Sequence, residues 1–88
     1  DALPISQGDA SSLESKGPFD MVIANINRNI LLADMKHYIA RMNPGAELLM
    51  SGFYIDDIPV IREEAERNGL HFVHHREKNR WAAVKFQK

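Results

Sequence analysis

Three absences limit what this sequence can be: it has no cysteine, no long apolar run and no marked excess of one charge. Without cysteine it forms neither a disulfide nor a thiolate metal site, so a reducing cytoplasm is the expected location. No apolar stretch approaches the roughly 18 residues that a membrane-spanning helix needs. A formal net charge of -1 gives no electrostatic reason to expect nucleic acid or an anionic membrane as a partner.

Length and composition bound the architecture. The 88 residues, 44% of them apolar and 26% charged, suffice for one small globular domain or for part of a larger one. The chain starts in mid-pattern without a methionine, which leads us to expect part of a longer protein. Its four histidines do not indicate a metal site, since His74 and His75 point to opposite faces of a strand and no carboxylate cluster accompanies them. No metal is therefore expected.

The most informative stretch is a predicted strand from Phe19 to Asn25. Four consecutive apolar residues, Met21 to Ala24, follow an acidic one, which is typical of a strand buried on both faces. Strands of this kind belong to parallel sheets, whose ligands bind in the crevice beyond the carboxyl ends of the strands. Asn25 would stand in that crevice, with an amide that both donates and accepts hydrogen bonds.

A helix is expected directly after this strand, because the spacing of apolar residues changes from two to 3.6. Asn27 or Asn29 can cap its start. Pro44 disfavours helical geometry at the residue before it, so the helix should end near Met42. The predicted apolar stripe consists of Leu31, Met35, Tyr38, Ile39 and Met42.

A second strand, Ala46 to Phe53, and a second helix follow. Asp56 and Asp57 suit the positive end of the helix dipole, and Pro59 is tolerated in a first helical turn. Gly69 can adopt the left-handed conformation that ends a helix. The buried side of this helix is predicted to consist of Ile58, Ile61 and Ala65.

The end of the chain differs in kind. Leu70 to His75 and Trp81 to Phe86 alternate imperfectly and are joined by Glu77-Lys78-Asn79, which predicts an antiparallel hairpin. A further short strand is expected within Leu3 to Gln7. The element order is thus strand, helix, strand, helix, hairpin, which is an α/β arrangement. Arg28 is interpreted as ordinary surface charge on the first helix.

This order, together with three motifs, resembles the carboxyl-terminal half of a class I S-adenosylmethionine-dependent methyltransferase. The likeness is greatest to the bacterial methyltransferases of the eleventh large-subunit ribosomal protein. Phe19 to Ile26 resembles the fourth strand of that family, Asn43 to Phe53 its fifth strand with the preceding turn, and Trp81 to Val84 its last strand. The resemblance implies a Rossmann-like, seven-stranded sheet whose final strand is inserted antiparallel, with helices mainly on one face of the part present here.

The resemblance also implies S-adenosylmethionine as the methyl donor and lysine amino groups of a ribosomal protein as acceptors. The glycine-rich loop that cradles the cofactor in this family and the acid that holds its ribose are missing. The family's amino-terminal substrate domain is missing too. Residues 1–88 are therefore expected to be the carboxyl-terminal part of a catalytic domain and to be inactive alone.

Site residues are assigned by the same resemblance. Residues after the fourth strand face the methyl donor and hold the acceptor nitrogen, which implies catalytic and cofactor-binding roles for Asn25 and a substrate contact for Ile26; the alternative for Asn25 is a helix cap. Asp9 resembles the acid that binds the adenine amino group, or it is a solvated turn aspartate. Phe53 and Tyr54 would border the lysine channel, or would pack against the second helix.

The missing strands have a physical consequence. The family places its first strand beside the fourth, so Phe19 to Asn25 is expected to present an unpaired edge. Both helices would lie on one face of the sheet and leave the other face bare. Self-association through the exposed edge or face is therefore expected.

Two other functions stay open. One is a class I methyltransferase acting on RNA, DNA or a small molecule, although the Asn-Pro-Pro-aromatic signature of base modification is absent because Ile26-Asn27 follows Asn25. The other is a non-catalytic α/β interaction module, such as a signalling receiver. A receiver needs an aspartate at the strand ends, where this chain has Asn25 and Ser51-Gly52.

Overall fold

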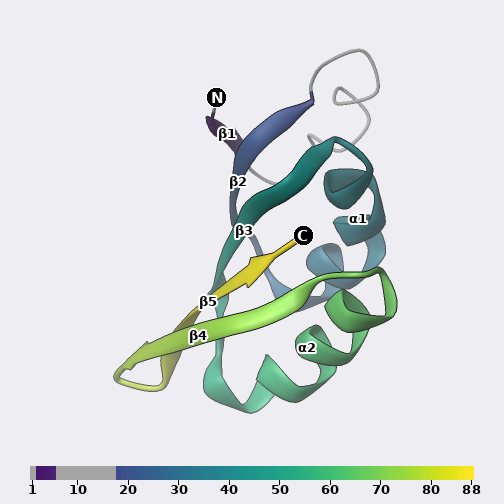
Figure 1. Ribbon diagram of the computed structural model, residues 1–88. Helices are drawn as coiled ribbons and strands as arrows, with labels where there is room; N and C mark the ends of the chain where they lie inside the picture. Colours follow the sequence, from purple (N-terminus) through teal and green to yellow (C-terminus); the bar gives the residue numbers. More distant parts are fainter. Residues whose placement is uncertain (1, 6–17) are drawn as a thin grey trace.

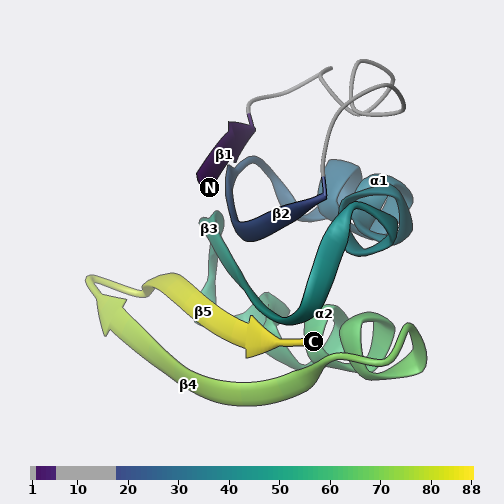
Figure 2. The same ribbon diagram turned by 45° about the horizontal axis from the view of Figure 1, so that its top comes forward.

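Five strands form one mixed sheet in the computed structural model, which describes residues 2–5 and 18–88 (Figure 1). The strands lie in the order β1-β2-β3-β5-β4. Both helices cover the same face of the sheet (Figure 2). The elements are β1 (Ala2–Ile5), β2 (Phe19–Asn25), α1 (Arg28–Ala40), β3 (Met42–Tyr54), a turn of 3₁₀ helix η2 (Ile55–Asp57), α2 (Ile58–Arg67), β4 (His71–Lys78) and β5 (Trp81–Gln87).

The strand directions confirm the predicted architecture. β1, β2 and β3 are parallel, and β5 runs antiparallel between β3 and β4. The order strand, helix, strand, helix, hairpin is therefore correct, and so is the antiparallel insertion of the last strand. Parallel strands need long crossover connections, which α1 provides between β2 and β3.

The prediction that β2 is buried on both faces is wrong for this chain. Val22 and Ala24 are fully buried, whereas Ile23 between them is 38% exposed. Successive side chains of a strand point to opposite faces, and the helices pack against only one of them. The expectation that the opposite face is bare of helices is thereby confirmed for the described residues.

The predicted unpaired edge of β2 is also wrong. β1 pairs with it in parallel, from Ala2 opposite Met21 to Ile5 opposite Ala24. An open strand edge presents unpaired N–H and C=O groups, which even a four-residue strand can satisfy. Proline is tolerated at such a position, because β1 is itself an edge strand of the described sheet. The expected strand within Leu3 to Gln7 therefore begins one residue earlier, and its last two residues lie outside the described part.

α1 forms as its pattern predicts, except that Met42, which was expected in its apolar stripe, belongs to β3. Its buried residues are Leu31, Met35, Tyr38 and Ile39. The side chain of Asn27 caps the helix by accepting a hydrogen bond from Ile30 N at 3.1 Å, which selects Asn27 over Asn29 as the cap. The helix ends at Ala40, two residues before the predicted end, because β3 already begins at Met42.

α2 and its flanks follow the prediction closely. Ile61 and Ala65 are buried as predicted, whereas Ile58 is only partly buried. Gly69 ends the segment with φ +91°. The outer face of α2 is charged and pairs internally through the pairs Arg62–Glu66, Arg67–Glu63 and Arg67–Glu64. Such exposed pairs contribute little each, but they keep this face in water.

The hairpin turn is shorter than predicted. Asn79 and Arg80 alone form the turn and both have positive φ, 52° and 70°, while Glu77 and Lys78 continue β4. A two-residue turn with two positive φ values matches the right-handed twist of the strands that it joins, and asparagine tolerates this conformation. The two-residue turn therefore makes this strand three residues longer at its end than predicted, since β4 ends at Lys78 and not at His75.

Candidate functional site

An open cleft lies where β2 and β3 end. It has a volume of about 680 Å³ and is lined by Asn25, Ile26, Asn27, Ser51, Gly52, Trp81 and Ala82. A second pocket of about 470 Å³ adjoins it and shares Asn27, Gly52 and Trp81 with it. Asn25 lies opposite Ser51 in the parallel pairing, so the cleft opens at the carboxyl ends of two parallel strands, where α/β sheets bind their ligands.

The floor of this cleft depends on a glycine. Gly52 has φ +98°, and an ideal Cβ built on it would lie 2.8 Å from Asn25 Oδ1 and 3.0 Å from the Ile26 carbonyl oxygen. Ile26 N also donates to the Ser51 carbonyl at 3.0 Å. The pairing of β3 with β5 shifts register between Ser51 and Phe53, which is a bulge of the kind found beside active sites. Gly52 therefore lets the Asn25 amide lie directly over the end of β3.

The other sequence-predicted residues differ in how far they reach the cleft. Ile26 lines the cleft and Phe53 the adjoining pocket, but both side chains belong to the core, at 5% and 2% exposure. Tyr54 lines the pocket with a side chain that is 46% exposed. Asp9 lies outside the described residues. The structure therefore brings Asn25, Ile26, Phe53 and Tyr54 to one end of the sheet.

Trp81 is a site residue that the sequence did not single out. It lines both the cleft and the adjoining pocket and is 51% exposed. Tyr54 and Trp81 are cross-strand partners, and their rings stack with centroids 4.3 Å apart and an interplanar angle of 27°. The available signal in the sequence was that Trp81 is the only tryptophan of the chain and stands at the start of a predicted strand.

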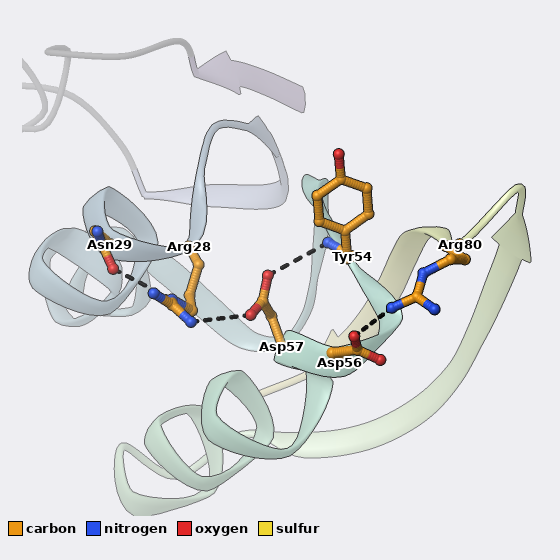
Figure 3. A network of polar contacts seen from close by, with 6 residues as sticks. All are labelled: Arg28, Asn29, Tyr54, Asp56, Asp57 and Arg80. Atoms are coloured by element: carbon orange, nitrogen blue, oxygen red, sulfur yellow. Dashed lines mark hydrogen bonds and ion pairs between the residues drawn. The ribbon is translucent and has the colours of Figure 1, made fainter.

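Arg28 has a contact that the sequence did not indicate. Its Nη1 lies 3.0 Å from Asp57 Oδ1, across 29 residues of sequence, and both residues line the 470 Å³ pocket. The Arg28 side chain is 45% exposed and that of Asp57 19%. Figure 3 shows the Arg28 guanidinium directed toward the Asp57 carboxylate. Arg28 is therefore an exposed charge, as expected, but its ion-pair partner is distant in the chain and no local pattern in the sequence indicates it.

The residues of the cleft floor are uncharged. Asn25, Ser51 and Gly52 offer amide, hydroxyl and backbone groups, which both donate and accept hydrogen bonds at any physiological pH. Within residues 2–5 and 18–88, no group of three histidine, cysteine or acidic side chains is placed to hold a metal ion. No helix of the described segments is long and apolar enough to cross a bilayer.

Among the described residues, Asp20 at the other end of β2 has a shifted pKa. Asn43 Nδ2 donates to Asp20 Oδ1 at 2.9 Å, and this hydrogen bond lowers the pKa of Asp20 from its ordinary value. A hydrogen bond to the charged form favours that form. The contact joins β2 to β3 beside their amino-terminal ends, away from the cleft.

Comparison with solved structures supports the fold. The chain is similar to a ribosomal protein L11 methylase from Lactobacillus delbrueckii subsp. bulgaricus, with a TM-score of 0.76 and 23% identity over 83% of this chain and 38% of that one. It is also similar to a Methanococcus jannaschii fibrillarin pre-rRNA processing protein, with a TM-score of 0.66 and 10% identity over 90% of this chain and 41% of that one. At these identities the likeness establishes the fold alone.

Comparison with known sequences establishes the family. The model of the family "Ribosomal protein L11 methyltransferase (PrmA)" matches residues 4–88. A relative from Bacteroides thetaiotaomicron, named ribosomal protein L11 methyltransferase, is 76% identical over 98% of this chain and 31% of its own length. One of the same name from Porphyromonas gingivalis is 53% identical over 90% of this chain and 27% of its own length. The chain spans less than a third of these relatives, and it belongs to the ribosomal protein L11 methyltransferase family.

Proposed function

We propose that residues 1–88 supply the carboxyl-terminal part of the catalytic domain of a cytoplasmic, S-adenosylmethionine-dependent methyltransferase. Its acceptors are lysine amino groups of ribosomal protein L11. The observation that carries the proposal is the cleft at the ends of β2 and β3, with the Asn25 amide held over Gly52. The names of the relatives supply the reaction and the acceptor protein.

The chemistry asks little of the protein beyond alignment. Bound S-adenosylmethionine would supply an electrophilic methyl group on a cationic sulfur. The acceptor amine must be neutral, and its lone pair must point at that methyl, so groups that hold the amine in line contribute most of the rate. The Asn25 side-chain oxygen and the Ile26 carbonyl oxygen both lie beside Gly52, where each can accept a hydrogen bond from the amine.

The cleft floor fits such a cofactor. Nearby oxygen atoms stabilise a cationic sulfur. The Asn25 side-chain oxygen and the Ile26 carbonyl oxygen both lie next to the position that a Cβ on Gly52 would occupy. Asn25 would therefore serve both the cofactor and the amine. Asp9 would accept a hydrogen bond from the adenine amino group. Ile26, Phe53 and Tyr54 would border the acceptor lysine.

A segment exchange tests this function. The 86 residues of the Bacteroides thetaiotaomicron relative that match this chain are replaced by those of this chain. Methyl transfer to purified ribosomal protein L11 is then followed by mass spectrometry. We expect an active hybrid, and Asn25→Ala should lower its kcat/KM by about 100-fold, since misalignment costs rates of this order. Lys36→Ala on the outside of α1 is the control.

Two results would contradict the proposal in different ways. A hybrid that folds and binds S-adenosylmethionine but transfers no methyl group would remove the proposed function. A hybrid that is active with Asn25→Ala at an unchanged rate would keep the function and remove the role of Asn25. The 88 residues alone should show no methyl transfer in the same assay.

A further inference from the structure

Two neighbouring aspartates of η2 point in different directions, Asp57 toward Arg28 and Asp56 toward Arg80 (Figure 3). Asp57 pairs with Arg28 at the start of α1, with Arg28 Nη1 3.0 Å from Asp57 Oδ1. Asp56 pairs with Arg80 in the hairpin turn, and Ile55 N donates to the Arg80 carbonyl at 2.8 Å. The turn η2 therefore contacts both the start of α1 and the hairpin turn.

Asp57 also contacts the backbone of Tyr54. Its second carboxylate oxygen, Oδ2, accepts a long hydrogen bond of 3.4 Å from Tyr54 N. The ring of Tyr54 stacks on Trp81, and both rings line the pocket that Arg28 and Asp57 also line. The carboxylate of Asp57 is largely withdrawn from water, at 19% exposure, so its charge is screened less than that of a fully exposed ion pair.

We propose that the Arg28–Asp57 ion pair is a clasp that positions the Tyr54–Trp81 stack at the mouth of the acceptor pocket. The proposal rests on the proposed function, because it assigns the 470 Å³ pocket to the acceptor. The substrate class is a lysine side chain, whose aliphatic stem packs on aromatic faces and whose ammonium, before deprotonation, is attracted to them. Arg28 and Asp57 act through Tyr54 and are positioning residues.

The clasp joins two connections that the sheet does not hold together directly. The start of α1 and the turn η2 lie on either side of the pocket. Arg28 and Asp57 form the charged contact between them across it. Arg28 also donates from Nε to Asn29 Oδ1 at 3.2 Å, which helps to orient the guanidinium. Loss of the ion pair therefore leaves the helices and the sheet intact and loosens only the residues at the mouth of the pocket.

The first experiment needs no activity, because Trp81 is the only tryptophan of the chain. Arg28→Ala and Asp57→Ala are made in the 88-residue protein. In both variants we expect a red-shifted tryptophan emission, stronger quenching by acrylamide and loss of near-ultraviolet circular dichroism. The far-ultraviolet spectrum should not change. The double variant should show no further shift, since both substitutions remove one contact.

A matched control removes a different ion pair. Glu66→Ala breaks the Arg62–Glu66 pair, which has a similar distance of 3.1 Å but lies on the outer face of α2. Its Trp81 signals should equal those of the unsubstituted protein. Arg28→Ala decides the test if Asp57→Ala does not fold. Trp81 emission and quenching unchanged in folded Arg28→Ala would overturn the clasp.

The second experiment measures kinetics in the hybrid enzyme described above. Arg28→Ala should raise the KM for ribosomal protein L11 by about tenfold and change kcat by less than about twofold, because a displaced pocket rim weakens binding more than it alters the reacting atoms. A fall in kcat at constant KM would overturn the assigned role. If the unsubstituted hybrid shows no methyl transfer, the proposed function fails, while the fluorescence measurements still decide whether the clasp exists.

Discussion

The side-chain oxygen of Asn25 occupies the space that a Cβ on Gly52 would need, with only 2.8 Å between the two positions. The two residues lie at the ends of neighbouring parallel strands, and Gly52 adopts a φ of +98° that other residues rarely tolerate. Because Gly52 has no side chain, the Asn25 amide can lie in this space.

Gly52→Ala should displace Asn25 as well as strain the backbone. The strain of a positive φ costs about 1–3 kcal/mol of stability, and the new methyl group also meets Asn25 and the Ile26 backbone. Gly45→Ala is the matched control, because Gly45 has φ +85° with nothing within 4 Å of its Cβ position. Urea unfolding of the two variants measures the stability difference.

Gly52→Ala and Gly45→Ala should also differ in activity. In the hybrid enzyme, Gly52→Ala is expected to reduce kcat/KM about as strongly as Asn25→Ala, since both misalign the amide. Gly45→Ala should retain the rate of the unsubstituted hybrid. Equal rates for the two glycine variants would show that the Asn25–Gly52 contact has no part in the reaction.

Asn27→Ala should destabilise the protein through the helix cap. Its side chain accepts from Ile30 N at 3.1 Å, and loss of such a cap costs about 0.5–2 kcal/mol. Asn29→Ala removes only a contact with the neighbouring Arg28 and should change stability by less than about 0.5 kcal/mol. Thermal unfolding of both variants distinguishes them, and equal melting temperatures would contradict the assignment of Asn27 as the cap.

Asn43→Ala should raise the pKa of Asp20 toward its ordinary value. The Asn43 amide donates to the carboxylate and holds its pKa below 3.8 in the folded protein. A lowered folded pKa stabilises the fold above the unfolded pKa, and this contribution disappears as the pH falls through the folded value. Carbon-detected NMR titration of the Asp20 carboxyl group in both proteins measures the shift; identical titration curves would contradict the contact.

The face of the sheet without helices should mediate self-association. Ile23 is 38% exposed on it, and removing an apolar side chain from water favours association. Sedimentation velocity of the 88-residue protein should show a concentration-dependent rise in mass that Ile23→Lys reduces. Val60→Lys alters an equally exposed apolar residue, at 41%, on α2 and should leave the association unchanged. A monomer at all concentrations would contradict the prediction.

Some of the fold could be predicted because its signals are local. The spacing of Leu31, Met35 and Tyr38 indicates a helix wherever it occurs, and Gly69 ends the next helix through its own backbone freedom. Asn25 was placed at a strand end by the same kind of reasoning. The error over the burial of β2 arose because its apolar run is the same whether one face or both faces are covered.

The sequence by itself determined the order of the elements, the antiparallel hairpin, the restriction of the α1 cap to Asn27 or Asn29, and the location of Asn25 at a strand end. All of these follow from periodicity, turn chemistry or a motif within a few residues. Only the tertiary structure decided that β1 covers the edge of β2, that Gly52 accommodates Asn25, and that Arg28 meets Asp57. The physical reason is that each of these contacts joins segments distant in the chain, and no short-range pattern specifies which distant partner will be brought within reach.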